Sequence, residues 1–224
     1  MEVLKSFAQQ GTRFFKQPDV LRRRLANVRA ILLDWDGVFN DGFKDLDGNS
    51  PFSEVDSMGL NLLRFTWWNM YKQLPPCAII TGQQNAMAEA FAKREHLNAV
   101  HMGFTHKPEA FTHFLKDHGL RADQVAFFFD DVLDLPIARI CGFSVLVRRS
   151  ASHLMELAAY KGNGDIGTGN SGATHGLREG CELMMYLSGR WDETLEHRVG
   201  STETYQNYLK ARNAIETQVL KKDR

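Results

Sequence analysis

The sequence predicts an α/β protein with a doubly wound parallel sheet. Short apolar runs alternate with segments whose apolar residues recur every three or four positions, the pattern of repeated strand and helix units. Acidic residues follow directly after two of these runs, where the ends of parallel strands would gather at one edge of a sheet. With 224 residues and 43% hydrophobic content, the chain can bury the core of one such domain.

Five segments are predicted strands. Each is a short run dominated by apolar residues, which is typical of strands that are buried on both faces of a parallel sheet. The five are Ala30 to Asp34, Cys77 to Ile80, Ala99 to Met102, Val125 to Phe129 and Phe143 to Val147.

Helices are predicted between and after these strands from their periodicity and end signals. The last of them is expected to be polar and largely exposed. The predicted helices are Leu60 to Tyr71, Asn85 to Arg94, Pro108 to His118, Leu135 to Ile140, Ala151 to Tyr160, a helix from Leu177 that ends at Gly189, and Thr202 to Lys221.

One insertion interrupts the alternation, between Gly42 and Phe52. Its Asp47-Gly48 pair predicts a β-hairpin, a small flap that overhangs the first acidic motif. The chain has too few residues there for a large cap domain as well. The predicted organisation is a helical N-terminal extension over residues 1–29, a catalytic domain over 30–190 and a helical C-terminal extension over 191–224.

The overall composition narrows the classes of ligand. The 27 basic and 27 acidic residues balance, and no basic run interleaves with aromatic residues, so neither a nucleic acid nor a membrane is expected as a partner. Cys77, Cys141 and Cys181 are dispersed, which favours reduced thiols and a cytoplasmic location. Small molecules are the expected ligands.

A glycine-rich segment, Lys161 to Gly176, twice matches the GxGxxG pattern of dinucleotide sites. That interpretation requires a strand immediately before the pattern and a helix after it. Because a helix is predicted before it, we interpret the segment as a flexible loop.

The acidic motifs suggest phosphoryl chemistry with a divalent metal. Asp34 and Asp36 follow the first strand, and Asp130 and Asp131 follow the fourth. Four carboxylates at one sheet edge repel one another strongly unless a cation such as Mg²⁺ binds among them. We therefore expect all four to contribute to a magnesium site.

Each residue of the expected site has a chemical role. A carboxylate at a rigid strand end, Asp34, can attack phosphorus, and Asp36 can transfer protons to the leaving oxygen and from water. Thr81 and Gly82 follow another strand and are expected to open a helix that holds phosphate oxygens, and Lys107 begins a further helix and adds a positive charge.

Taken singly, each motif has a structural alternative. Aspartates after a strand often cap a helix, a Thr-Gly pair is common at a helix start, and a lone lysine is usually solvated. Their order and placement at strand ends together favour a phosphoryl-transfer site.

The motifs together resemble the haloacid dehalogenase (HAD) superfamily of aspartate-dependent phosphatases. The segment from Asp34 to Gly42 resembles the first motif of the superfamily, in the form used by its capless sugar-acid phosphatases. The resemblance extends over about Ala30 to Leu187. Further matches occur in the same order at Phe52, Asp56 and Gly59, at Ile79 to Gly82, at Lys107, at Asp130, Asp131 and Asp134, and at Gly176 to Glu179.

The resemblance implies a Rossmann-like fold and a magnesium-dependent phosphomonoesterase. It implies Asp34 as nucleophile, Asp36 as acid/base with its backbone carbonyl on the metal, and Asp130 as a metal ligand. Thr81 and Lys107 would contact the phosphate. It further implies a homo-tetramer in which the flap and a neighbouring chain help to cover the site.

Four residues depart from the pattern of the sugar-acid phosphatases. Val55 and Ser57 stand where Arg-Asp-Gly is usual, Gln83 replaces an arginine, and Phe129 replaces a glycine. Two arginines suited to a substrate carboxylate are therefore absent from those positions.

Three functions are compatible with these features. The first is a phosphatase acting on a small phosphorylated metabolite, a sugar or sugar acid. The second is a non-catalytic protein that keeps the fold for binding or as a scaffold. The third, a phosphotransferase or mutase, is less favoured because a short insertion offers no folded cap to exclude water.

Overall fold

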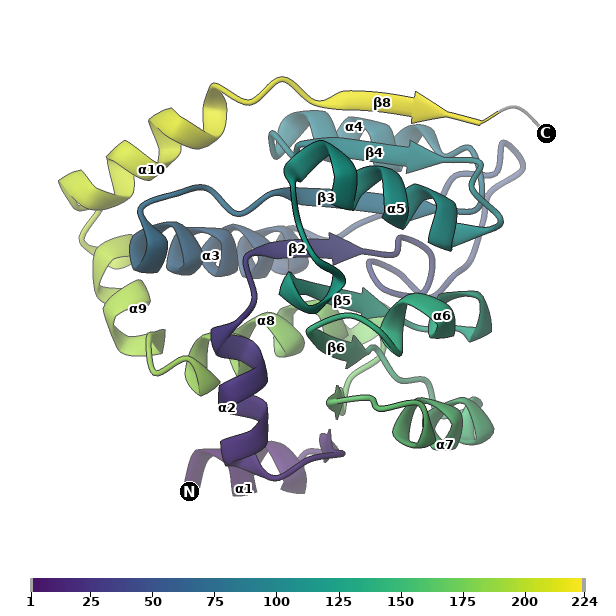
Figure 1. Ribbon diagram of the computed structural model, residues 1–224, viewed down its shortest axis with the longest axis horizontal. Coiled ribbons are helices and arrows are strands. Elements are labelled where there is room, and N and C mark those ends of the chain that lie inside the picture. Colours follow the sequence, from purple (N-terminus) through teal and green to yellow (C-terminus); the bar gives the residue numbers. More distant parts are fainter. Residues whose placement is uncertain (1, 223–224) are drawn as a thin grey trace.

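The computed structural model describes residues 2–222. It contains one mixed sheet of eight strands in the order β1-β7-β6-β5-β2-β3-β4-β8, with helices on both faces (Figure 1). All neighbouring strands are parallel except β1, which runs antiparallel to β7. The predicted α/β class and doubly wound parallel sheet are confirmed. The strands are β1 (Arg13–Phe14), β2 (Ala30–Leu33), β3 (Cys77–Thr81), β4 (Ala99–Met102), β5 (Val125–Phe129), β6 (Phe143–Leu146), β7 (Ile166–Gly167) and β8 (Gln218–Lys221).

The helices divide between the two faces because successive strand residues point to opposite sides. In β2, Ile31 and Leu33 belong to the core under α2, α3, α4 and α8, whereas Ala30 and Leu32 belong to the core under α5, α6 and α7. Figure 1 shows α5 and α6 in front of the sheet, with α3 and α8 behind it. The helices are α1 (Glu2–Gln9), α2 (Pro18–Ala26), α3 (Glu54–Tyr71), α4 (Ala86–Arg94), α5 (Lys107–His118), α6 (Leu135–Ala138), α7 (His153–Lys161), α8 (Gly176–Leu187), α9 (Trp191–Val199) and α10 (Glu203–Asn213), with short 3₁₀ helices η1 (Ala122–Gln124), η2 (Val132–Asp134) and η3 (Gly172–Thr174).

Two residues from the resemblance join α3 to α8. A Cβ on Gly59 would lie 3.1 Å from the Cα of Arg178, so the close approach of these helices requires glycine at this position. The buried Asp56 carboxylate accepts hydrogen bonds from the Arg178 amide and from His175 Nδ1, at 2.9 and 3.1 Å. Asp56 therefore secures the start of α8.

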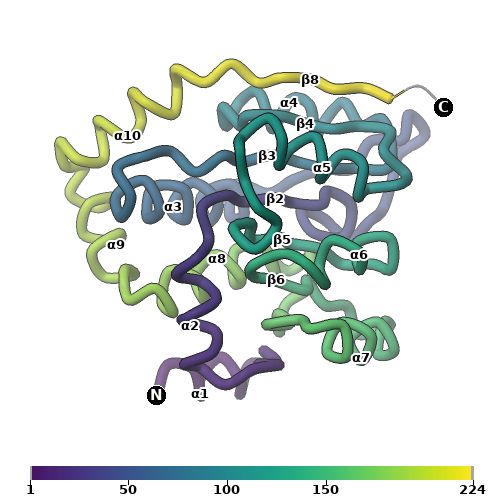
Figure 2. Tube along the Cα trace, in the orientation of Figure 1, coloured from purple at the N-terminus to yellow at the C-terminus, as the bar shows by residue number. Residues whose placement is uncertain are grey.

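The C-terminal segment differs from the predicted terminal helix. The expected helix over Thr202 to Lys221 is wrong in its second half, because α10 ends at Asn213 and β8 pairs in parallel with β4. The helix is also not largely exposed, since Tyr205 and Tyr208 are buried against Phe65 of α3. Backbone pairing at a sheet edge has no periodic sequence signal in so short a strand. Figure 2 follows the chain to this edge strand.

Two loop predictions are corrected by the structure. The segment from Gly42 to Phe52 contains a tight turn, in which the Asp45 amide donates to the Asn49 carbonyl at 2.9 Å, but no strands flank it. It is a loop and not a β-hairpin. The glycine-rich segment is not simply a flexible loop, because β7 lies within it and pairs with β6.

The remaining composition-based expectations concern cysteines and membranes. The three cysteines are buried and free, and burial raises the pKa of the Cys77 thiol to about 11. Among residues 2–222, none of the helices combines the length and the hydrophobicity of a membrane span. The division at residues 29 and 190 stays a prediction.

Candidate active site

A cleft of about 550 Å³ lies at the carboxyl edge of the sheet. The carboxyl ends of parallel strands meet there, so side chains distant in the sequence line one space. All seven residues selected from the sequence border it. The lining residues are Asp34, Asp36, Gly42, Thr81, Gly82, Gln83, Thr105, Lys107, Asp130, Asp131, Val132, Leu133, Asp134 and Arg149.

Asp34 and Lys107 form a buried charge pair in the centre of the cleft. The Asp34 amide donates to the Phe128 carbonyl at 2.9 Å, which fixes the end of β2 against β5. Lys107 Nζ lies 2.7 Å from Asp34 Oδ1 and 2.6 Å from Asp134 Oδ1. All three side chains are at most 6% exposed. One ammonium group therefore faces two carboxylates with little water to screen them.

The protonation of this triad follows from that imbalance. Burial disfavours the charge of Lys107, but the Asp34 and Asp134 carboxylates outweigh it and raise the pKa of the lysine above its ordinary value. Burial, and then the charge of Asp34, raise the pKa of Asp134 well above the usual range of an aspartate. Lys107 is thus held in its charged form, and Asp134 retains a proton more readily than an ordinary aspartate.

Asp130 lies beside Asp34 and in contact with the turn after β2. It is 3% exposed. Gly37 has a φ of +84°, and a Cβ at this position would overlap the Asp130 carboxylate, so the turn requires glycine for both conformation and space. Arg149, which follows β6, forms an ion pair with Asp130.

Three carboxylates fit a divalent cation. One oxygen each from Asp34, Asp130 and Asp134 lies within 4.8 Å of the others. Hard oxygen donors at a cleft open to water suit Mg²⁺, which keeps several water ligands. The two other residues predicted to bind metal, Asp36 and Asp131, lie outside this group. Asp131 is 60% exposed at its side chain and caps η2 by accepting from the Val132 amide at 2.7 Å.

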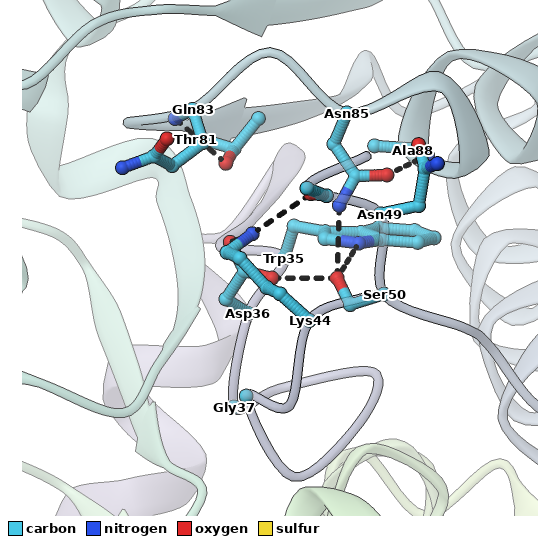
Figure 3. Close-up of polar contacts among 12 residues, drawn as sticks. Trp35, Asp36, Gly37, Lys44, Asn49, Ser50, Thr81, Gln83, Asn85 and Ala88 are labelled. Carbon is cyan, nitrogen blue, oxygen red and sulfur yellow. Dashed lines mark hydrogen bonds and ion pairs between the residues drawn. The ribbon is translucent and has the colours of Figure 1, made fainter. Parts of the chain in front are cut away.

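Asp36 is held by the loop that follows it. Ser50 Oγ donates to Asp36 Oδ1 at 2.6 Å, and Lys44 Nζ contacts Asp36 Oδ2 at 2.8 Å. The Trp35 indole and the Asn85 amide both donate to Ser50 Oγ, at 2.9 and 2.8 Å (Figure 3). Each carboxylate oxygen of Asp36 therefore has one partner in the loop, which fixes the orientation of this side chain.

Thr81 and Gly82 line the cleft, but they do not open a helix. The helix after β3 begins at Ala86, so this expectation is wrong. The first amides of α4 are already bonded, since Asn85 Oδ1 accepts from Met87 and Ala88. Any phosphate contact must come from the Thr81 hydroxyl and the loop backbone, not from this helix end.

Of the four residues that depart from the pattern of the sugar-acid phosphatases, one lies at the cleft and three do not. Phe129 packs into the core and stacks on Phe127, with ring centroids 5.7 Å apart, so it does not narrow the cleft. Val55 and Ser57 lie in the first turns of α3, where Ser57 Oγ donates to Glu95 at 3.0 Å. Gln83 alone lines the cleft.

Sequence reasoning did not select Asp134, Ser50, Lys44 or Arg149 as site residues. Asp134 carried a signal, because it was part of the resemblance at a fixed spacing after Asp130. Arg149 also carried one, as a charged residue just beyond a predicted strand. Ser50 and Lys44 had none, since only the path of the loop brings them to Asp36.

Comparison with known proteins agrees with this fold. No family model matches the chain. The chain is 27% identical over 171 residues to the 3-deoxy-D-manno-octulosonate 8-phosphate phosphatase KdsC of Escherichia coli, an alignment that covers 75% of this chain and 84% of the relative. A putative HAD superfamily (subfamily III A) hydrolase from Legionella pneumophila has a TM-score of 0.65 at 26% identity and covers 81% of this chain and 95% of its own.

A third relative was solved with ligands. The 3-deoxy-D-manno-octulosonate 8-phosphate phosphatase from Moraxella catarrhalis, in complex with a magnesium ion, a phosphate ion and a KDO molecule, has a TM-score of 0.65 at 24% identity, with coverage of 80% of this chain and 98% of its own. This likeness concerns the fold. The magnesium expectation for the present chain agrees with its own carboxylate group.

The fold and these relatives indicate a hydrolase of phosphate monoesters that resembles the HAD phosphatases. Within that class, the chain resembles the KdsC phosphatases.

Proposed function

We propose that this protein is a magnesium-dependent phosphatase that acts on a small phosphorylated metabolite, a sugar or sugar-acid phosphate, through an aspartyl-phosphate intermediate. One observation carries the proposal: the buried Asp34 carboxylate at the end of β2 is in contact with Lys107 and clustered with Asp130 and Asp134. KdsC relatives, named for a sugar-acid phosphate, support the substrate class.

Each side chain has a role in the proposed reaction. An Asp34 oxygen forms a bond to phosphorus as the bond from phosphorus to the leaving oxygen breaks. Asp36 gives a proton to that oxygen, then removes one from the water that attacks the phosphoenzyme and releases phosphate. Lys107 contacts Asp34 and Thr81 lines the same cleft, so both can hold the equatorial oxygens.

The metal site would use Asp34, Asp130 and Asp134, with the Asp36 backbone carbonyl as implied by the resemblance. Mg²⁺ bound there would neutralise charge on the phosphate and on the nucleophile. Among the residues described, only a loop and α3 separate β2 from β3, so no cap domain covers the cleft and water is the proposed acceptor.

The assembly remains a proposal. Phe43 and Leu46 on the loop after β2, and Val132 and Leu133 at the cleft, are large apolar residues more than half exposed. Such a group of exposed residues around a cleft favours coverage by another chain. The homo-tetramer and the cytoplasmic location stay predictions.

Replacement of Asp34 by Asn tests the mechanism. The amide keeps the shape of the side chain but is a poor nucleophile, so phosphate release from a panel of phosphosugars should fall by about a thousandfold or more. Wild-type activity should depend on added Mg²⁺ after treatment with EDTA. An inactive wild-type protein would contradict the phosphatase proposal, and an active Asp34→Asn variant would contradict the intermediate.

A further inference from the structure

Arg149 joins the cleft to a second cavity. It lies three residues beyond β6 and lines both the cleft and an adjoining space of about 280 Å³. The second cavity is polar. Its lining residues are Arg148, Arg149, Ser150, Gly169, Ser171 and Thr174.

Arg149 follows a strand that lies on the opposite side of β2 from the strands that carry or precede the proposed phosphate contacts. In the sheet order, β6 lies beyond β5 on one side of β2. On the other side lie β3, which ends at Thr81, and β4, which precedes Lys107. Strands are about 4.8 Å apart, so the β6 and β3 backbones are separated by about 14 Å. A phosphate held by Thr81 and Lys107 therefore leaves Arg149 available for a different group.

The guanidinium group of Arg149 is only partly engaged. It pairs with the buried Asp130 carboxylate and lies 3.9 Å from the exposed Asp131 carboxylate. Its Nε is buried and has no hydrogen-bond partner among residues 2–222. Arg148, by contrast, donates hydrogen bonds to Glu156 and to backbone carbonyls, so it is a fixed part of the second cavity.

Metal binding and the Arg149 contact compete for one carboxylate. Asp130 belongs to the group of three carboxylates that fits a divalent cation. A cation there would repel the guanidinium and bind the same carboxylate. The side chain is long, 35% exposed and adjacent to an open polar cavity, so it can turn away from Asp130 into that space.

We propose that Arg149 exchanges partners: it pairs with Asp130 while the metal is absent, and with a second anionic group of the substrate, in the second cavity, once a divalent ion binds Asp130. The proposal rests on the proposed phosphatase function. It makes Arg149 a specificity-determining residue and limits good substrates to phosphate esters that carry a further carboxylate or phosphate. A planar guanidinium suits either group because it can bind two oxygens at once.

The first test is a calorimetric titration with Mg²⁺ alone, without substrate. Arg149→Gln removes the competing cation and should bind Mg²⁺ about fivefold more tightly than the wild type, or better. Arg149→Lys keeps the charge and should stay near the wild-type affinity. Arg121→Gln is the matched control, because Arg121 is a largely exposed arginine paired with Asp123 that does not line the cleft. Equal or weaker Mg²⁺ binding by Arg149→Gln overturns the exchange.

The second test uses three esters: glucose 6-phosphate, 6-phosphogluconate, which adds a carboxylate, and fructose 1,6-bisphosphate, which adds a phosphate. In Arg149→Gln, the kcat/KM ratio of a doubly anionic ester to glucose 6-phosphate should fall by about tenfold or more, mainly through KM. The ester that loses most identifies the anion. A uniform loss over all three esters overturns the specificity role.

Failure of the phosphatase proposal is distinguishable from failure of this one. If the wild type hydrolyses none of the esters, their binding in the presence of Mg²⁺ is compared in the wild type and Arg149→Gln. Weaker binding of only the doubly anionic esters by the variant supports the exchange, and equal binding overturns it.

Discussion

Replacement of Lys107 by Met should lower both the free energy of unfolding of the protein and its kcat. The substitution removes the ammonium group that faces Asp34 and Asp134, whose side chains are 6% and 0% exposed. Breaking a buried charge pair by removing one partner costs about 3–5 kcal/mol, because the remaining charge stays in a poorly solvated position. We expect a loss of that size in the free energy of unfolding, and a fall in kcat of about a hundredfold or more.

The double variant Lys107→Met/Asp134→Leu separates the two effects. Replacing both buried partners by apolar groups of similar volume is often nearly neutral, so about half of the lost stability or more should return. Activity should not return, because the proposed contact between Lys107 and the phosphate is still missing. Lys93→Met is the surface control: Lys93 is 56% exposed at its side chain and pairs with Glu89, a contact expected to contribute about 0–1 kcal/mol.

The measurement is urea unfolding with EDTA present, at several pH values. The folded state raises the pKa of Asp134. This group therefore stabilises the fold fully at a pH below its pKa in the unfolded chain, and that contribution is lost as the pH rises through its pKa in the folded state. The penalty of Lys107→Met should therefore grow from acidic pH towards neutral and alkaline pH. A penalty no larger than that of Lys93→Met would refute the buried triad. A double variant with restored activity would refute the proposed contact between Lys107 and the phosphate.

The remaining predictions concern Ser50 and His101. Ser50→Ala leaves the Trp35 and Asn85 donors without their acceptor and removes the hydrogen bond to one oxygen of Asp36. The free energy of unfolding should fall by about 1–3 kcal/mol and kcat by about tenfold or more, a larger effect on kcat than that of Lys44→Met. Steady-state kinetics that show no change in kcat would contradict this prediction. Burial lowers the pKa of His101 from 6.5 to about 4. The neutral imidazole therefore contributes its full stability at a pH above its pKa in the unfolded chain, and this contribution is lost as the pH falls towards its pKa in the folded state. Between pH 7 and pH 5 the wild type should lose roughly 2 kcal/mol more than His101→Leu in urea unfolding, and parallel losses would contradict the buried neutral imidazole.

Local sequence determined five of the eight described strands, most helices and the positions of the acidic motifs. β2 to β6 were predicted to within one residue at each end, because a strand buried on both faces is a continuous apolar run. The rule that parallel strands share a carboxyl edge then placed Asp34, Asp36, Thr81, Lys107 and Asp130 around one cleft. These relations depend on spacing along the chain, which the sequence contains.

Tertiary structure decided the contacts between segments that have no fixed spacing. The exposed Asp131 and the buried Asp134 are three residues apart, and only the 3₁₀ turn between them shows which of the two faces Asp34. The closing of the loop on Asp36 through Ser50, the pairing of β8 with β4, and the arrival of Arg149 beside Asp130 also depend on long-range packing. Sequence by itself therefore determined the class of chemistry, and the fold decided which side chains surround it, because charge and burial at the site result from residues far apart in the chain.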